Sequence, residues 1–331
     1  EPRSPQSPRA STVLAMTSLF RRTLMWLGLA WLAWRLFGPD PVPRTVGEQR
    51  RPLMVPGRSV FVGRHEFFVR ELGDPEAPVL VLIHGWNFDG EMAFHKLAPL
   101  LATRYRVVVP DLRNHGKSDR IRGSFDLGDV AEEVDATIDA LGIAKPVAIL
   151  GYSMGGMVAQ ELALRHPESL YALVLGATAA RPIHTLRPVS LALFKLTRAV
   201  ARISRAEAVW ASFLVLKRNG LIGAEDEAWM WDSLLARDAN LYHEAAYAIW
   251  RFDTRDRIGA LSVPTMVVIP ERDTVVRVSR QEELAALLPD APVVRLPDLG
   301  HESILADPGG FADAVFAFLD PLVDRAEPDE A

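Results

Sequence analysis

Between about residues 59 and 320, short aliphatic runs alternate with segments whose apolar residues recur at helical spacing. The aliphatic runs are continuous, as in 79–83, which is typical of strands buried on both faces of a parallel sheet. In the other segments the apolar residues form one stripe, as Val130, Val134 and Ile138 do, which is typical of helices packed on a sheet. The alternation predicts an α/β fold, with a mostly parallel sheet flanked by helices and joined by right-handed crossovers.

The same pattern gives the approximate position of each element. Strands are expected at 59–62, 66–71, 79–83, 105–109, 147–150, 170–175, 264–269 and 292–296. Helices are expected at 92–103, 127–141, from the end of the 147–150 strand to about 165, at 278–288 and at 308–319.

Residues 180–257 interrupt this rhythm, because they are almost free of strand patterns and read as helical. We expect them to form a helical cap inserted between two strands of the sheet. Within this segment, 189–204 combines apolar with basic residues. It is either a basic amphipathic surface element or a lid helix that covers a pocket, and we favour the lid.

These patterns divide the chain into four parts. The predicted parts are 1–58, with a disordered start, an apolar segment and a Pro-rich linker; 59–179 together with 258–320, the core; 180–257, the cap; and 321–331, an acidic and loose tail.

Residues 20–37 form a strongly apolar segment ahead of the predicted core. The uncharged run within it, 23–34, is shorter than the roughly 20 residues that span a bilayer, and Arg21, Arg22 and Arg35 flank it. It is rich in Leu and Trp, and Trp favours the boundary between membrane and water. We therefore expect residues 20–37 to associate the protein with a membrane, as a short signal anchor or as an interfacial helix.

Two other interpretations of this segment stay open. Arg21 and Arg22 followed by an apolar run of this length also fit an export signal that is cleaved, although no small-x-small cleavage site follows. The other interpretation is a helix that packs on the folded domain.

Composition narrows the classes of protein that remain. Hydrophobic residues make up 49% and charged residues 24% of the chain, which is ordinary for a globular protein and excludes wholesale disorder. The net charge of −5 argues against a dedicated nucleic-acid binder. The chain has no Cys, which excludes disulfides, thiolate metal sites and a cysteine nucleophile. No helix opens with a dinucleotide-binding or Walker A glycine pattern.

Residues Gly151–Gly155 read Gly-Tyr-Ser-Met-Gly and lie between a predicted strand and a predicted helix. The glycines at both ends allow a very tight turn without side-chain clashes. Such a turn lifts the Ser153 hydroxyl off the end of the strand and onto the helix N-terminus. There, the Met154 N–H and the helix dipole face a developing oxyanion. The motif in this context predicts a nucleophile elbow with Ser153 as the nucleophile.

Three further strand ends carry reactive groups, and sites in open α/β sheets form beyond the carboxyl ends of strands. These groups are His84, Asp273 and His301. The order Ser153, Asp273, His301 is that of hydrolases with a nucleophile elbow. We predict that His301 takes the Ser153 proton and returns it to the leaving group. Asp273 would hold the imidazole in the required tautomer.

Backbone N–H groups of Trp86 and Met154 are predicted to form the oxyanion hole. His84, just before Trp86, is expected to support this loop through hydrogen bonds rather than to transfer protons. Asp111 and His115 are expected to shape their own loop.

One alternative to Asp273 stays open. Asp298 lies closer to His301 in the sequence, so it is a rival for the orienting acid.

These residues resemble the motifs of the α/β-hydrolase superfamily over about residues 59–320. The matching stretches are His84-Gly85, Asp111–Ser118, Gly151–Gly156, Asp273 and Gly300-His301. Among family members, the chain is similar to the capped bacterial esterases, enol-lactonases, carbon–carbon hydrolases and cofactor-free haloperoxidases.

The resemblance implies a cap at 180–257 and a triad at Ser153, Asp273 and His301. Ser153 separates the chain from haloalkane dehalogenases and epoxide hydrolases, which carry Asp at that place. The chain departs from the family pattern at Pro270, where Gly is usual.

The expected activity is that of a serine hydrolase that cleaves a small apolar carboxylic ester, or a related acyl bond, through an acyl-enzyme. This chemistry implies neither a metal ion nor an organic cofactor. Two alternatives stay open: carbon–carbon bond hydrolysis or perhydrolysis on the same triad, and a non-catalytic, membrane-tethered binding protein of this fold.

Overall fold

The computed structural model describes residues 22–23, 25–31, 33, 57–182 and 205–326. The chain divides into two compact units, Glu1–Val46 and Gly47–Ala331.

The second unit is built on an eight-stranded sheet, as far as the described residues show, in the order β1-β2-β4-β3-β5-β6-β7-β8. Strands β1 and β2 form an antiparallel pair, and β2 runs antiparallel to β4. Every other neighbouring pair is parallel. The strands are β1 (Gly57–Val62), β2 (His65–Leu72), β3 (Val79–Ile83), β4 (Arg106–Pro110), β5 (Val147–Tyr152), β6 (Leu170–Gly176), β7 (Thr265–Pro270) and β8 (Val293–Leu296).

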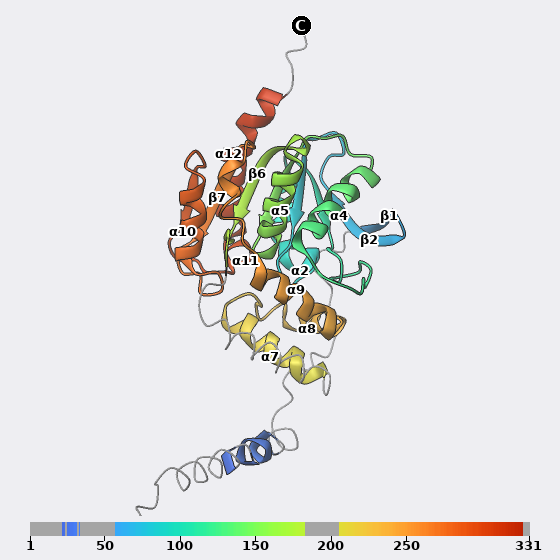
Figure 1. Ribbon diagram of the computed structural model, residues 1–331, viewed down its shortest axis with the longest axis vertical. Coiled ribbons are helices and arrows are strands. Elements are labelled where there is room, and N and C mark those ends of the chain that lie inside the picture. The colour runs from blue at the N-terminus through green and yellow to red at the C-terminus, as the bar shows by residue number, and fades with distance from the viewer. Residues whose placement is uncertain (1–21, 24, 32, 34–56, 183–204, 327–331) are drawn as a thin grey trace, which may run out of the picture. The chain divides into compact units, whose positions relative to one another are not determined.

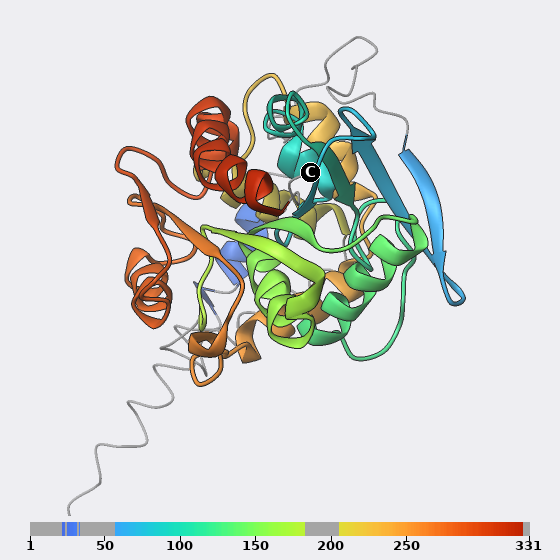
Figure 2. The ribbon, with the colours of Figure 1, turned by 90° about the horizontal axis from the view of Figure 1, so that it is seen from above.

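Helices lie on both faces of this sheet (Figures 1 and 2). They are α2 (Gly90–Phe94), α3 (Ala98–Leu101), α4 (Leu127–Ala140), α5 (Met154–Arg165), α7 (Arg205–Arg218), α8 (Glu227–Leu235), α9 (Ala239–Arg251), α10 (Val278–Leu287), α11 (Ser303–Ala306) and α12 (Pro308–Ala326), with short 3₁₀ turns at Pro167–Ser169 and Ile258–Ala260. The predicted α/β fold, a mostly parallel sheet flanked by helices, is therefore confirmed.

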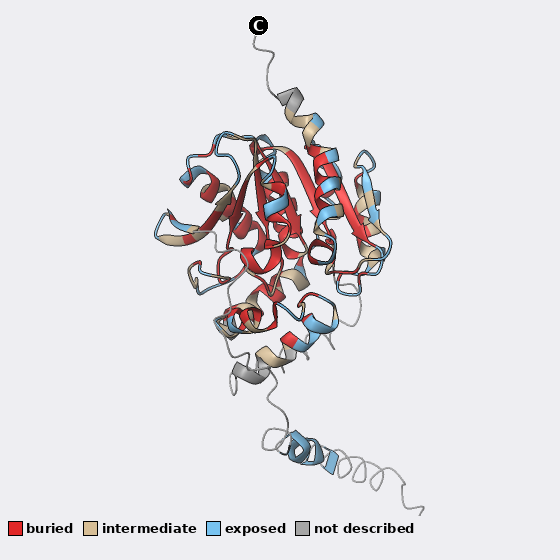
Figure 3. Cartoon of the chain, turned by 180° about the vertical axis from the view of Figure 1, so that it is seen from behind, coloured by how far each residue is buried: buried red, intermediate tan, exposed pale blue. Residues whose placement is uncertain are grey.

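The core has two apolar layers because successive side chains of a strand point to opposite faces of the sheet. On one face, Val81 and Ile149 belong to the layer that includes α4, α5 and α10. On the other face, Leu80 and Leu150 belong to the layer that includes α2, α3 and α12. Figure 3 shows the central strands buried between these helices. This double burial explains the continuous aliphatic runs in the sequence.

Helices α7, α8 and α9 interrupt the strand–helix alternation between β6 and β7, and no strand lies among the described residues from 177 to 264. We call the segment 205–251 the helical insertion (Figure 1). The segment 189–204, expected as a lid helix or surface element, lies outside the described residues, which resume at 205.

The prediction of a single helix at 92–103 is wrong. Two short helices stand there instead: Asp89 caps the start of α2, and Pro99 lies in the first turn of α3. Proline is favoured at the start of a helix and disfavoured inside one, because it lacks an N–H and its ring clashes with the preceding turn. Pro99 therefore marks the start of a second helix rather than the middle of one.

The final helix is also longer than predicted. Helix α12 continues from Pro308 through Pro321 to Ala326, so the first part of the expected loose tail is helical. Leu322 and Val323 pack against the apolar core, and this packing extends the helix beyond the proline.

In the first unit, the described residues at 22–23, 25–31 and 33 are helical and exposed. Trp26 is 66% exposed and Trp31 is 52% exposed. Within the part of the chain that the structure describes, no helix is both long enough and apolar enough to cross a bilayer. The predicted disordered start and most of the predicted Pro-rich linker lie outside the described residues.

Candidate active site

Ser153 lies in a strained turn between β5 and α5. Its backbone has φ 57° and ψ −118°, a combination that non-glycine residues rarely adopt and that costs on the order of 1–3 kcal/mol. The turn is tight enough that a Cβ on Gly155 would lie 1.9 Å from the Ile83 carbonyl oxygen. Position 155 therefore accepts only glycine in this backbone conformation, which accounts for the glycine of the motif.

A continuous hydrogen-bond chain joins Ser153, His301 and Asp273. The His301 Nε2 atom is 3.0 Å from the Ser153 Oγ, and the His301 Nδ1 atom is 2.8 Å from the Asp273 Oδ2. The three residues follow β5, β8 and β7, which the sheet brings to one edge. In this arrangement, Nδ1–H donates to the carboxylate and Nε2 accepts the serine proton, as a general base requires.

The Asp273 carboxylate is held by further donors besides His301. Its Oδ1 accepts the backbone N–H groups of Val275 and Val276 at 2.8 and 2.9 Å. Its Oδ2 also accepts from the Gln281 side-chain amide at 2.9 Å. Gln281 lies on α10 and was not predicted as a site residue, because nothing in the sequence indicates which residue a helical glutamine contacts. Four donors fix the carboxylate in both position and orientation.

The rival acid, Asp298, does not contact His301. It lies on the surface, where its side chain is 80% exposed and accepts a hydrogen bond from Arg272 at 2.6 Å. The structure therefore brings Asp273, and not Asp298, to the imidazole.

The predicted oxyanion loop follows β3 and passes against the nucleophile. A Cβ on Gly85 would lie 3.1 Å from the Ser153 Cβ. His84 holds this loop from the side of the sheet: its Nε2 accepts the Leu112 N–H at 3.0 Å, and its Nδ1 donates to the Gly85 carbonyl at 2.9 Å. Burial lowers the pKa of His84, so the ring stays neutral and keeps both roles at neutral pH.

The Met154 N–H, the second predicted oxyanion donor, lies at the start of helix α5. Met154 is the first residue of that helix, and N–H groups in a first turn have no acceptor within the helix. The Met154 N–H therefore points toward the helix N-terminus, beside Ser153, where the helix dipole favours negative charge.

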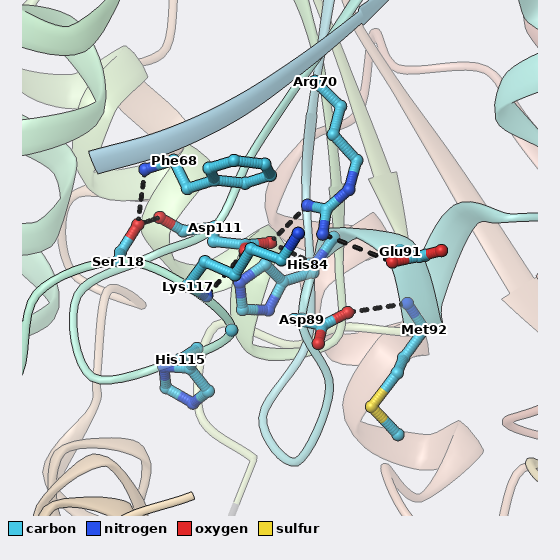
Figure 4. A network of polar contacts seen from close by, with 12 residues as sticks. Phe68, Arg70, His84, Asp89, Glu91, Met92, Asp111, His115, Lys117 and Ser118 are labelled. Atoms are coloured by element: carbon cyan, nitrogen blue, oxygen red, sulfur yellow. Dashed lines mark hydrogen bonds and ion pairs between the residues drawn. The ribbon is translucent and has the colours of Figure 1, made fainter. Parts of the chain in front are cut away.

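A buried ion pair supports the loop that carries Leu112 (Figure 4). Arg70 and Asp111 are 2% exposed or less, and Arg70 Nη1 donates to Asp111 Oδ1 at 2.9 Å. The same carboxylate accepts the backbone N–H groups of Gly90 and Lys117, both at 2.9 Å. A buried pair is tolerable when its remaining lone pairs are satisfied in this way. Asp111 therefore links β2, α2 and the loop after β4, the shaping role expected for it.

A cavity of about 230 Å³ opens at Ser153 and His301. Its walls are mostly apolar and come from the core and from the helical insertion: they include Phe88, Met157, Leu216, Leu221, Ile249 and Val276. Such a cavity favours an apolar group next to the reacting bond. Among the described residues, no group of three or more potential metal ligands is clustered.

Comparison with known sequences identifies the class of protein. The pattern of the family described as "alpha/beta hydrolase fold" matches residues 78–308, a stretch that includes Ser153, Asp273 and His301. The chain therefore belongs to the α/β-hydrolase family and is an enzyme of that fold.

Individual relatives place it among the esterase-like members. The chain is 28% identical over 263 residues to the pimeloyl-(acyl-carrier protein) methyl ester esterase of Chromobacterium violaceum, a match that covers 76% of this chain and 98% of that protein. It is 31% identical to the putative carbamate hydrolase RutD of Pseudomonas syringae, over 77% of this chain and 98% of that protein. The crystal structure of the enol-lactonase from Burkholderia xenovorans is similar with a TM-score of 0.68 and 25% identity, covering 80% of this chain and all of the other.

Proposed function

We propose that this protein is a serine hydrolase that cleaves a carboxylic ester through an acyl-enzyme. The observation that carries the proposal is the hydrogen-bond chain from Ser153 through His301 to Asp273. Relatives named as a methyl ester esterase and an enol-lactonase support an ester as the bond that is cleaved.

In the first half of the reaction, Ser153 Oγ attacks the ester carbonyl while His301 Nε2 takes the hydroxyl proton. The carbonyl oxygen becomes an oxyanion, which the N–H groups of Trp86 and Met154 would stabilise. Collapse of this intermediate breaks the bond to the alcohol, and His301 returns its proton to the departing oxygen. The acyl group then remains on Ser153.

In the second half, His301 takes a proton from water, which attacks the acyl carbonyl. Collapse of the second intermediate returns that proton to Ser153 Oγ and releases the carboxylic acid. The Asp273 carboxylate keeps the imidazole in the Nδ1–H tautomer and stabilises its positive form in both halves.

The apolar cavity supports a substrate with an aliphatic or aromatic group beside the ester. Because its walls include Met157 from the core and Leu216 and Ile249 from the insertion, the helical insertion would act as the cap predicted from the sequence. A series of p-nitrophenyl esters of rising acyl length would show kcat/KM rising until the chain outgrows the cavity.

The decisive experiment is covalent labelling with a fluorophosphonate. The wild type should be labelled at Ser153, and Ser153→Ala should fold normally, lose the label and lose nearly all ester turnover. Residual catalysis would come only from binding and the oxyanion hole. Labelling that persists at another residue in the variant would reject the assignment.

We further infer that residues 20–37 associate the enzyme with a membrane. The exposed Trp26, Leu27 and Trp31 side chains support this, since an exposed apolar surface of this kind marks an interaction site. The segment takes no part in the chemistry.

A further inference from the structure

The helical insertion contacts the predicted oxyanion loop directly. The Trp86 indole stacks on the Tyr242 ring, with centroids 4.5 Å apart and planes 18° apart. The Trp86 Nε1–H also donates to the Tyr242 carbonyl at 3.1 Å. Tyr242 lies on α9, so one residue of the insertion holds the loop through both its ring and its backbone.

A second contact fixes the next residue of the loop. Asn87 has φ 79°, in the left-handed region that, besides glycine, asparagine enters most readily because its short polar side chain can hydrogen-bond nearby. Its side-chain Oδ1 accepts from Arg237 Nη1 at 2.9 Å. Arg237, between α8 and α9, therefore stabilises the backbone turn that follows Trp86.

Arg237 and Tyr242 also contact each other. The Arg237 guanidinium carbon lies 5.2 Å from the centre of the Tyr242 ring, a distance at which a cation is attracted to an aromatic face. Burial lowers the pKa of Arg237 to about 10, so the guanidinium keeps its charge at neutral pH. The two residues and the loop thus form one contiguous group.

We propose that Arg237 and Tyr242 are positioning residues for the oxyanion hole: they hold Trp86 and Asn87 so that the Trp86 N–H faces the oxyanion. The proposal rests on the proposed hydrolase function. The loop is then held on two sides: His84 holds it at the end of β3, and Arg237 and Tyr242 of the insertion hold it on the other side. When the insertion packs on the core, it completes the oxyanion hole and also lines the cavity.

Geometry at this loop should matter more for the transition state than for the substrate, because the oxyanion exists only after attack. A displacement of about 1 Å at a catalytic group can cost about 10²-fold in rate. Loss of the Arg237 contact should therefore lower kcat far more than it changes KM.

The test compares Arg237→Met, which removes the guanidinium, with Arg237→Lys, which can still donate to Asn87. Arg251→Met is the matched control, because Arg251 is exposed on α9, the same helix as Tyr242. Steady-state hydrolysis of p-nitrophenyl butyrate is measured per active site, counted by titration with a fluorophosphonate. Inhibition by a trifluoromethyl ketone, whose adduct places an oxyanion in the hole, is measured in parallel.

We expect Arg237→Met to lose about 10²-fold in kcat and a similar factor in affinity for the ketone, with KM changed less than threefold. Arg237→Lys should recover part of both losses, and Arg251→Met should lose neither. Values for Arg237→Met within twofold of the wild type would overturn the proposal. So would a loss that appears only in the number of active sites, since that indicates a structural role.

Asn87→Gly provides a second route if Arg237→Met does not fold. Glycine tolerates the positive φ but removes the acceptor for Arg237, so kcat should fall in the same direction. Where Arg237→Met does fold, the two losses should be strongly non-additive in the Arg237→Met/Asn87→Gly double variant, and simple additivity would contradict the proposal. If the fluorophosphonate did not label Ser153 in the wild type, the hydrolase function itself would be rejected. Failure of this proposal and failure of the proposed function are therefore distinguishable.

Discussion

At the scale of single residues, four hydrogen bonds converge on the Asp273 carboxylate. Only one of them comes from His301; the other three come from Gln281 and two backbone N–H groups of the following turn. A carboxylate held this firmly keeps the imidazole ring from rotating. The orienting role proposed for Asp273 therefore also depends on the local turn and on Gln281 of α10.

Replacing Asp273 by Asn should reduce kcat by about 10⁴-fold, because the amide favours the wrong histidine tautomer. Asp298→Asn serves as the control, since Asp298 is exposed and contacts Arg272; its kcat should stay within about twofold of the wild type. Ester hydrolysis by both purified variants measures the difference. If Asp298→Asn were the more damaging change, the assignment of Asp273 would be wrong.

At the scale of elements, the turn between β5 and α5 is packed so closely that it has no space for a side chain at Gly155. The carbonyl of Ile83, at the end of β3, occupies the space that a side chain at 155 would need. The elbow and the neighbouring strand therefore fit together as one unit, and a change at either affects both.

Gly155→Ala should lower the free energy of unfolding by about 3 kcal/mol or more, because the new methyl meets rigid backbone. Gly142→Ala is a suitable comparison: Gly142 has φ +72°, and no other atom lies within 4 Å of the added carbon. It should cost only about 1–2 kcal/mol. Urea denaturation measures both, and equal losses would show that the contact with Ile83 is unimportant.

An ion pair between a histidine and a carboxylate joins the end of α5 to α4. His166, at the end of α5, lies 2.8 Å from Glu132 on α4, and this hydrogen bond raises the pKa of His166. The stabilisation is complete below the unfolded-state pKa of about 6.5 and is lost as pH rises through the higher folded-state pKa. Glu132, whose pKa the same bond lowers, stays charged throughout.

The wild type should therefore gain stability relative to His166→Gln as pH falls from 8 to 6. The pair is partly exposed, so the gain should be below about 1 kcal/mol. Urea denaturation of both proteins at pH 6 and pH 8 provides the comparison. A difference that does not change with pH would show that the pair does not contribute.

Much of this architecture could be predicted from the sequence, for physical reasons that the individual elements show. Strands such as β3 are buried on both faces, so their aliphatic runs are unmistakable, and the elbow needs its glycines. The break at Pro99 was missed because apolar periodicity continues across it. Gln281, Arg237 and Tyr242 could not be found, because their roles depend on contacts with residues far away in the sequence.

At the scale of the whole molecule, the exposed apolar helix and the hydrolase unit belong to separate compact units. An enzyme that lacks residues 1–50 should be soluble and should hydrolyse a small soluble ester at the full-length rate, whereas the full-length protein should sediment with membranes. Cell fractionation shows where each protein is found, and turnover of the soluble ester gives the rate of each. A full-length protein found wholly in the soluble fraction would contradict membrane association through residues 20–37, as would aggregation or inactivity of the truncated protein.

The positions of Ser153, Asp273 and His301, which directly follow β5 or lie in the loops after β7 and β8, have a consequence for how the chain folds. His301 and Ser153 are 148 residues apart in the sequence, and their strands become close only when β6 and β7 have paired between them. Contacts of such long range form late, after local helices. On dilution from urea, the helical circular dichroism signal should return first and ester hydrolysis last, so that the return of activity reports completion of the sheet.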